Sequence, residues 1–211
     1  MSAKRLFDIV FSAAFLLIVS PLMLLITLLI KLVNPGPAFY RADRAGKDFQ
    51  RFSMYKFRTM SVNLDRVELI TRRGDPRIFP LGKFLRKTKM DELPQLVNVL
   101  KGEMSVVGPR PEDYVIALRV FSGPYRELLS IRPGLTSPAS LFDYTHGETV
   151  ASVDEYADRY LHQRLSMDLR YIKNRNIRRD AKIIAQTAWT ILLVSLGRKR
   201  FRYPAEYSAL Q

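Results

Sequence analysis

The stretch that decides the fold is 9-IVFSAAFLLIVSPLMLLITLLI-30, an uncharged apolar run with Ser20-Pro21 at its centre. At ~1.5 Å of rise per residue, a straight helix of this length would just cross a ~30 Å hydrocarbon core. Pro21 removes one backbone hydrogen bond and clashes with the preceding turn. The run therefore places the chain in a membrane and predicts that its helix is broken or kinked near the middle.

Basic residues flank the apolar run on both sides: Lys4, Arg5, Lys31, Arg41 and Arg44. Because basic flanks prefer the cytoplasm, a single crossing would put one of them on the wrong side. A helix that enters the bilayer, breaks at Ser20-Pro21 and returns satisfies both flanks. A kinked spanning helix is the open alternative, since membrane helices tolerate proline. A cleaved signal peptide fits poorly because the run is long and has no small-residue cleavage site.

The composition narrows the chemistry that the chain can perform. With 211 residues, one domain is expected, and the absence of cysteine excludes disulfides and thiolate metal sites. Two histidines cannot build a His-rich zinc cluster, so any metal is expected to be a hard cation held by carboxylates and phosphates. The net charge of +14 predicts an acidic partner: nucleic acid, anionic lipid or a phosphorylated substrate. The apolar N-terminus favours the last two, and a merely solvated basic surface is the alternative.

The rest of the chain predicts an α+β, mostly helical fold with one small β-hairpin. The hairpin is expected from strands at Ala38–Arg41 and Phe49–Phe57 around a turn at residues 44–48. Ile183–Leu196 is a second uncharged stretch, and Trp189 with basic ends suits an amphipathic helix in the membrane interface, a buried core helix being the alternative. Further helices are expected at Lys83–Lys87, Asp91–Leu100, Pro111 to about Phe121 and Asp154–Lys173, and a short helix or loop at Leu64–Thr71.

Asp91-Glu92 is the best candidate for catalytic carboxylates. The pair is expected to open a helix, where the dipole lowers carboxylate pKa values and attracts phosphate. An ionised Asp91 could act as a nucleophile or as a ligand of Mg²⁺. The alternative is an ordinary helix cap. No Walker loop, Gly-x-Gly-x-x-Gly, nucleophile elbow or His-Glu-x-x-His motif occurs.

Several cationic residues could bind phosphate. Arg110 lies between two prolines that fix its backbone, so its planar fork could be aimed at a phosphate. Arg132, before Pro133-Gly134, repeats this arrangement, and Lys56 and Arg58 fall on one face of a strand. For these residues the alternatives are a structural arginine and a solvated strand face. Asp168 lies among cations on an apolar-striped helix, where an ion-pair role is the alternative to catalysis.

Taken in order, the motifs of the chain resemble those of the bacterial sugar transferase family, the monotopic phosphoglycosyl transferases in their minimal catalytic form. The resemblance covers nearly the whole chain, and the run around Asp91-Glu92 is its most specific part. The matching segments are 4-KRLFD-8, 20-SP-21, 55-YKFRTM-60, 81-LGKFLR-86, 90-MDELPQLVNVLKG-102, 107-VGPRP-111 and 132-RPGLT-136, with Asp168, Tyr171, Asn174 and Asp180.

This resemblance implies transfer of a sugar 1-phosphate from a UDP-sugar to undecaprenyl phosphate, with Mg²⁺ as cofactor and UMP as product. Asp91 matches the nucleophile, which forms a covalent phosphosugar intermediate, and Glu92 matches its partner in holding metal or phosphate. The reaction is the first membrane step of glycoconjugate synthesis, such as exopolysaccharide, O-antigen, capsule or glycoprotein. The family's positions near phosphate and nucleotide match Lys56 or Arg58, Arg86, Arg110, Arg132 and Asp168.

The resemblance also implies a re-entrant helix broken at Ser20-Pro21 and a catalytic core on the cytoplasmic face of the bacterial inner membrane. The single domain would divide into a membrane helix (1–33), a core (38–176) and a C-terminal interfacial helix with its tail (178–211). The chain departs from the family at 137-SPAS-140, where many members have Gly-Trp-Ala-Gln, so the sugar is left open. The sequence also leaves open whether the protein forms a homodimer.

Two rival functions come from other classes. The first is a non-catalytic basic scaffold that binds anionic lipids. It explains the charge and both apolar segments but gives no role to Asp91-Glu92. The second is a membrane-anchored nucleic-acid binder, which is disfavoured because the basic residues are spread along the chain rather than gathered in one arm or recognition helix.

Overall fold

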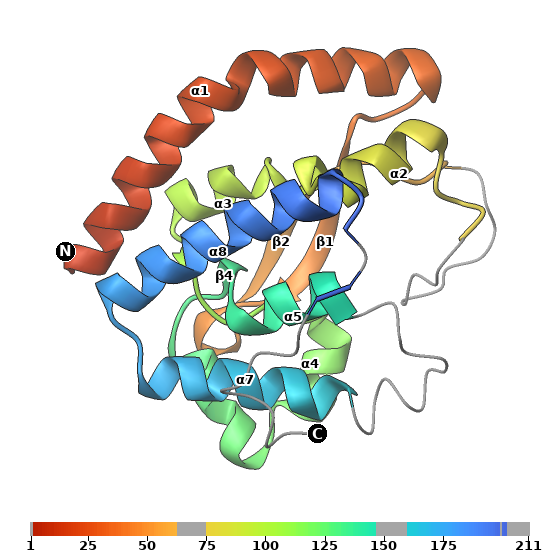
Figure 1. The fold of residues 1–211 in the computed structure, drawn as a ribbon. Coiled ribbons are helices and arrows are strands. Elements are labelled where there is room, and N and C mark those ends of the chain that lie inside the picture. The colour runs from red at the N-terminus through yellow and green to blue at the C-terminus, as the bar shows by residue number, and fades with distance from the viewer. Residues whose placement is uncertain (1, 63–74, 147–159, 199, 202–211) are drawn as a thin grey trace.

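The apolar run lies inside α1 (Ala3–Val33), one continuous helix that changes direction near its middle (Figure 1). Pro21 has no N–H to donate to the Leu17 carbonyl, and the Ser20 hydroxyl donates to that carbonyl at 2.9 Å instead. The step at Ser20-Pro21 is therefore a bend with a repaired hydrogen bond. The helix is not interrupted there, so the expected break is a bend in this structure.

The surface of α1 is unlike that of a core helix. The computed structural model describes residues 2–62, 75–146, 160–198 and 200–201, and α1 is the one helix in these ranges that is long and apolar enough to cross a membrane. Only four of its residues are buried, and Leu17 and Ile18 are 76% and 72% exposed. Large exposed apolar surface on this scale fits association with a membrane.

Both ends of α1 are fixed to the rest of the protein. At the N-terminal end, Arg5 donates to the carbonyls of Val99 (2.6 Å) and Leu100 (2.9 Å). At the C-terminal end, Asn34 caps the helix and donates to Ser61 Oγ at 3.0 Å. The α1 helix therefore arches over the protein and contacts it near both of its ends (Figure 1).

The expected β-hairpin is present. Strand β1 (Phe39–Ala45) pairs antiparallel with β2 (Arg51–Phe57), and Tyr40 lies opposite Lys56. The strands are joined through a 3-10 turn, η1 (Lys47–Phe49), that is closed by a hydrogen bond from Gly46 N to Gln50 O (2.8 Å). β1 is longer than expected because the turn begins later in the sequence.

A second sheet was not expected from the sequence. The strands β3 (Ser105–Val107) and β4 (Gly134–Thr136) are parallel and only three residues long. They approach so closely that a Cβ atom on Gly134 would lie 2.1 Å from the backbone nitrogen of Gly108. Glycine is therefore required at this point, and the loop that follows β3 is held in place by β4.

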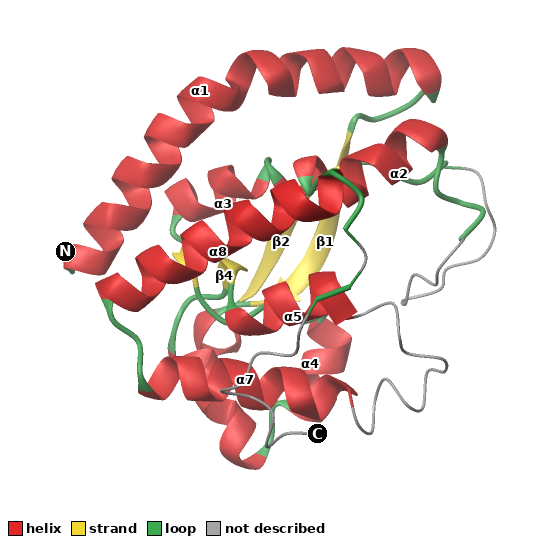
Figure 2. Ribbon diagram, in the orientation of Figure 1, coloured by secondary structure: helices red, strands yellow, loops and turns green. Residues whose placement is uncertain are grey.

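Helices dominate the remaining described structure (Figure 2). The expected helix from Pro111 begins only at Tyr114, since Asp113 is its N-cap. The long helix expected from Asp154 is described from Leu161, and residues 154–159 and Leu64–Thr71 lie outside the described ranges. The bounds are α2 (Pro80–Lys87), η2 (Met90–Glu92), α3 (Gln95–Lys101), α4 (Tyr114–Val120), η3 (Gly123–Ser130), α5 (Pro138–His146), α7 (Leu161–Lys173) and α8 (Ile177–Ser195).

Two buried apolar clusters organise these elements. The larger joins α3, β3, α7 and α8 through residues such as Val99, Val106 and Leu165. The second joins α1 to the hairpin and to α2 through Ile30, Phe57 and Leu85. The second half of α1 is therefore packed against the elements that lead into Asp91.

Helix α8 has the two faces expected of an interfacial helix. It begins at Ile177, earlier than the apolar stretch that predicted it, because Asn176 caps it by accepting from Arg179 N at 2.9 Å. Ile183 is buried, whereas Trp189 and Leu192 are 61% and 48% exposed. One side of α8 thus belongs to the core and the other presents apolar side chains to the surroundings.

Candidate active site

Asp91 and Glu92 lie in the short 3-10 turn η2, between α2 and α3. The expectation that they open an α-helix over Asp91–Leu100 is wrong, since α3 begins at Gln95. The reason is Pro94, which has no N–H to donate to the Met90 carbonyl. That carbonyl accepts from Leu93 N at 3.3 Å instead, with the three-residue spacing of a 3-10 turn.

The Asp91 side chain is nearly inaccessible to water, with 6% of its surface exposed. Its Oδ1 atom is buried and has no hydrogen-bond partner among the described residues. Burial, together with the charge of Glu92, raises the pKa of Asp91, and the cations Lys56, Lys89 and Arg86 oppose that rise. Such an oxygen lacks a partner of its own and is free to bond to phosphorus or to a metal ion.

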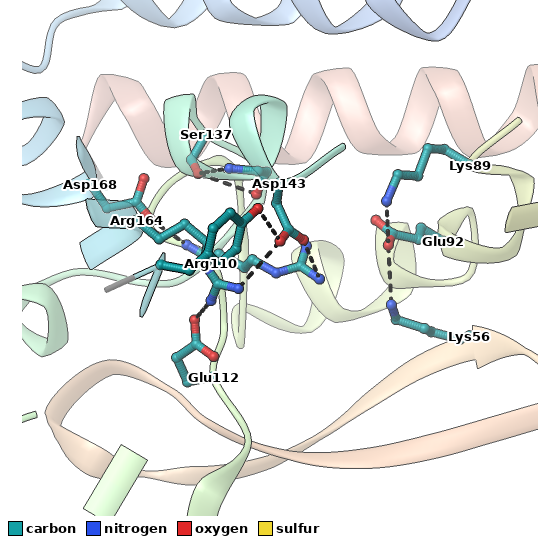
Figure 3. A network of polar contacts seen from close by, with 11 residues as sticks. Lys56, Lys89, Glu92, Arg110, Glu112, Ser137, Asp143, Arg164 and Asp168 are labelled. Carbon is teal, nitrogen blue, oxygen red and sulfur yellow. Dashed lines mark hydrogen bonds and ion pairs between the residues drawn. The ribbon is translucent and has the colours of Figure 1, made fainter. Parts of the chain in front are cut away.

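Glu92 lies between two lysines (Figure 3). Its Oε1 accepts from Lys56 Nζ at 3.1 Å and from Lys89 Nζ at 3.5 Å. Burial favours the neutral acid, but the charges of Lys56, Lys89 and Arg110 overcome it and hold the pKa of Glu92 below its ordinary value. Glu92 is therefore charged at neutral pH.

Arg86 is part of the same cluster. It comes from the last turn of α2, and its Nε donates to Thr59 Oγ1 at 2.8 Å. Burial lowers the pKa of Arg86, and the charge of Asp91 opposes this. The cluster thus consists of two carboxylates surrounded by cations from β2, α2, the turn before η2 and the loop after β3, namely Lys56, Arg86, Lys89 and Arg110.

Arg110 is held through both its backbone and its side chain. Its amide donates to Asp168 Oδ2 at 2.8 Å, and its Nη2 lies 3.4 Å from Asp143 Oδ2. Asp168 also accepts from the Ala139 amide at 3.4 Å and is 3% exposed. Burial raises the pKa of Asp168 to about 6, against the hydrogen bond from the Arg110 backbone. Asp168 therefore fixes the Arg110 loop to α5 in this structure, and none of the contacts described here joins it to Asp91.

A buried arginine, Arg164, forms ion pairs that hold this loop in place (Figure 3). Arg164 of α7 forms an ion pair with Glu112 and another with Asp143 at 3.5 Å. Burial lowers the pKa of Arg164 to about 9. Asp143 thus lies between Arg110 and Arg164, and this network ties the loop after β3 to two helices.

Two predicted phosphate-binding residues have other partners in the structure. Arg58 donates to Asn34 Oδ1 at 2.6 Å and also to the Asn34 carbonyl, so it braces the end of α1. Arg132 Nε donates to the Gly102 carbonyl at 2.6 Å, beyond the C-terminal end of α3. Since η2 precedes the N-terminal end, the ~10 Å length of this helix separates Arg132 from Asp91.

The arrangement fits a magnesium ion that is held largely by substrate. Among residues 2–62, 75–146 and 160–198, no three acidic, histidine or cysteine side chains lie so that they could hold a metal ion by themselves. Mg²⁺ is commonly bound by one or two carboxylates together with phosphate oxygens. The Oδ1 atom of Asp91, which has no hydrogen-bond partner, and the neighbouring Glu92 are suited to be the protein's ligands to such an ion.

Sequence reasoning overlooked four residues of the site region: Lys89, Asp143, Tyr144 and Arg164. Lys89 was given no role, and its left-handed backbone (φ 57°) could not be foreseen at a lysine. Asp143 and Tyr144 follow the segment that departs from the family pattern, so no motif marked them. A buried Arg164 paired with Glu112, 52 positions away, leaves no local pattern in the sequence.

Comparisons with known proteins show which proteins this chain is similar to. A family model described as bacterial sugar transferase matches residues 1–194. The exopolysaccharide production protein PSS of Rhizobium leguminosarum bv. phaseoli is 40% identical over 193 residues, which cover 87% of this chain and 92% of the relative. A UDP-glucose:undecaprenyl-phosphate glucose-1-phosphate transferase of Caulobacter vibrioides is 39% identical over 90% of this chain and 69% of its own length. A protein of the same description from Escherichia coli K12 is 37% identical, and the match spans 39% of its length.

Proposed function

The chain belongs to the bacterial sugar transferase family, and we propose that it transfers a sugar 1-phosphate from a UDP-sugar to undecaprenyl phosphate with release of UMP. The observation that carries this proposal is the desolvated Asp91 carboxylate, whose Oδ1 has no partner. Lys56, Lys89 and Arg86 act on it electrostatically. A water-excluded nucleophile among fixed cations suits attack on an anionic phosphate.

The proposed chemistry proceeds in two displacements. Asp91 attacks the phosphorus that bears the sugar, a bond from its carboxylate oxygen to phosphorus forms, and the bond to UMP breaks. A phosphate oxygen of the lipid then attacks the same phosphorus and releases Asp91. Lys56, Arg86, Lys89 and Arg110 balance the charge that develops on the phosphoryl oxygens.

Glu92 and the metal have supporting roles in this proposal. Asp91 and Glu92 would hold Mg²⁺ together with substrate phosphate oxygens, and the ion would supply further neutralisation of the phosphate charge. Glu92, charged between Lys56 and Lys89, fixes both ammonium groups beside Asp91. The residues themselves orient the phosphate and exclude water from it.

The contacts of α1 support a re-entrant arrangement. Its N-terminal end is bonded to α3 and its C-terminal end packs on the hairpin and α2, so both ends meet the same body of the protein. Lys4 reinforces the first contact through Asp180 at 3.1 Å. We therefore propose that α1 dips into the bilayer and returns, with the core on the cytoplasmic face of the inner membrane, the side that basic flanks prefer.

The activity is tested with purified protein, Mg²⁺, undecaprenyl phosphate and a panel of UDP-sugars that includes UDP-glucose, with UMP release as the readout. Without the lipid phosphate we expect no more than one UMP per enzyme, because Asp91 stays occupied after the first displacement. With lipid phosphate in excess we expect continued UMP release, and no turnover from Asp91→Asn. Asp43→Asn is the matched control, because Asp43 lies on the outer end of the hairpin and pairs with exposed Arg51. Absence of UMP from the wild type with every sugar would reject the proposal in favour of a non-catalytic scaffold.

The topology is tested with single cysteines, which are unambiguous because the protein has none of its own. Cysteine at Ser2 should be protected from a membrane-impermeant maleimide in intact cells and labelled after lysis. Labelling of intact cells would place this end outside and reject re-entry. Light scattering of the purified protein decides between a monomer and the homodimer that the sequence allows.

A further inference from the structure

Helix α5 contributes two adjacent side chains to the surroundings of the carboxylate pair. Asp143 lies 3.4 Å from the Arg110 guanidinium. Tyr144 has its ring 4.8 Å from Lys89 Nζ, and its hydroxyl donates to the Lys87 carbonyl. The two cations contacted from α5 are among those that keep Glu92 charged. This helix begins within residues 137–140, the segment in which the chain departs from the family pattern.

The contact of Tyr144 falls on a strained piece of backbone. Lys87 is the last residue of α2, and its carbonyl is one of those that a helix end leaves without an internal partner. Two residues later, Lys89 adopts a left-handed conformation (φ 57°), which is unfavourable for a side chain of this kind. A hydrogen bond at Lys87 and a ring against Lys89 therefore hold the segment that leads directly into η2.

The chemistry of the phenol suits this role. Burial, together with the charges of Asp91 and Glu92, raises the pKa of Tyr144 to about 12. The hydroxyl therefore remains protonated and can donate to the carbonyl at any working pH. An ammonium over the ring face is stabilised by a cation–π interaction.

We infer that Tyr144 is a positioning residue of the transfer reaction, which holds the Lys87–Lys89 connection and so keeps the Lys89 ammonium against Glu92. The inference rests on the proposed function, because it assigns Tyr144 a part in the same site. Tyr144 acts through Lys89 and has no direct part in bond making.

The test is a double-mutant cycle on kcat/KM for UMP release, with Tyr144→Phe, Tyr144→Leu and Lys89→Met. Tyr144→Phe removes one hydrogen bond and is expected to lower kcat/KM about 2- to 10-fold. Tyr144→Leu also removes the ring contact and is expected to cost about 10- to 100-fold. In the Lys89→Met background, both Tyr144 substitutions should change kcat/KM less than 3-fold, because the residue through which they act is gone.

Tyr55 provides a matched control. It is also a tyrosine beneath a lysine, with Lys101 Nζ 4.6 Å from its ring and donating to its hydroxyl at 2.7 Å, but this pair lies at the far end of α3. Tyr55→Phe and Tyr55→Leu should keep kcat/KM within about 3-fold, and melting temperatures check that all variants are folded.

The outcomes separate the two claims. The inference is overturned if the losses in kcat/KM from the Tyr144 and Lys89 substitutions multiply in the double variants. It is also overturned if both Tyr144 variants keep the wild-type kcat/KM. If Tyr144→Leu does not fold, the cycle with Tyr144→Phe, which keeps the ring, decides alone. Failure of the proposed function would instead appear as absence of UMP release from the wild type.

Discussion

Asp8→Ala should detach the first turns of α1 from the core. The Asp8 carboxylate is 2% exposed, although it lies only one residue before the apolar run. It accepts from Lys4 Nζ at 2.9 Å, from Ser105 Oγ at 2.9 Å and from the Val106 amide at 3.1 Å. Removal leaves the Val106 amide buried without a partner, and Lys4 keeps only Asp180.

The magnitude follows from these contacts. Breaking a buried, hydrogen-bonded ion pair costs about 3–5 kcal/mol of unfolding free energy. For a chain of this size, about 2–4 °C of melting temperature corresponds to each kcal/mol, so Tm should fall by about 6–20 °C. The assay is thermal unfolding in detergent, followed by near-UV circular dichroism, with Asp43→Ala as an exposed control that should shift Tm by no more than about 2 °C.

A second readout measures how firmly the N-terminal end of α1 is held. In the Asp8→Ala background, a cysteine at Ser2 should react faster with maleimide in detergent than in the wild-type background, because the N-terminal end of α1 is no longer tied down. An unchanged Tm together with an unchanged labelling rate would refute the reasoning, since the buried carboxylate would then contribute nothing to holding α1.

Three further predictions concern the site and the bend. Burial raises the pKa of Asp168 from 3.8 to about 6 in the folded protein. Between about pH 4 and pH 6 the folded state therefore keeps a proton that the unfolded state has lost, and the free energy of unfolding falls as the pH rises through this range. The Tm of Asp168→Asn should therefore rise relative to wild type across this window, and a constant Tm difference would contradict the assignment. Arg86→Gln should lower kcat/KM for UMP release by about 100-fold or more, whereas Arg132→Gln, beyond the far end of α3, should change it less than about 3-fold; equal losses would place both at the phosphate. Pro21→Ala should straighten α1 and increase labelling of a Ser2 cysteine from outside intact cells, and labelling that stays at the wild-type level would remove the bend as the cause of re-entry.

The elements that the sequence predicted are those with a local cause. The hairpin follows from aromatic residues alternating around a polar turn, and α1 follows from the length and hydropathy of a single run. The acidic pair was found because it is local in sequence. Its placement in a 3-10 turn was missed because proline is tolerated in the first turn of an α-helix, and the sequence does not say whether the helix begins before Pro94 or after it.

What the sequence could not predict depends on contacts between distant segments. Arg58 and Arg132 have the same chemistry as Arg110, and only the fold decides that the first two bond to Asn34 and Gly102. β3 and β4 are too short to produce a periodic pattern, and their pairing rests on the close approach at Gly134. The sequence therefore identified these arginines as candidates, and their different partners became visible only in the structure.

Helix α2 explains why a membrane helix and a phosphate site are built into one domain. Leu85 is buried with Ile26 and Ile30 of α1. The next residue, Arg86, points its guanidinium to Thr59 and acts on Asp91. Successive helical residues differ by about 100° around the axis, so one turn of α2 faces the membrane helix and the carboxylate pair at once. In the proposed reaction, α2 would therefore connect the helix that associates with the membrane to the carboxylate that attacks the phosphate.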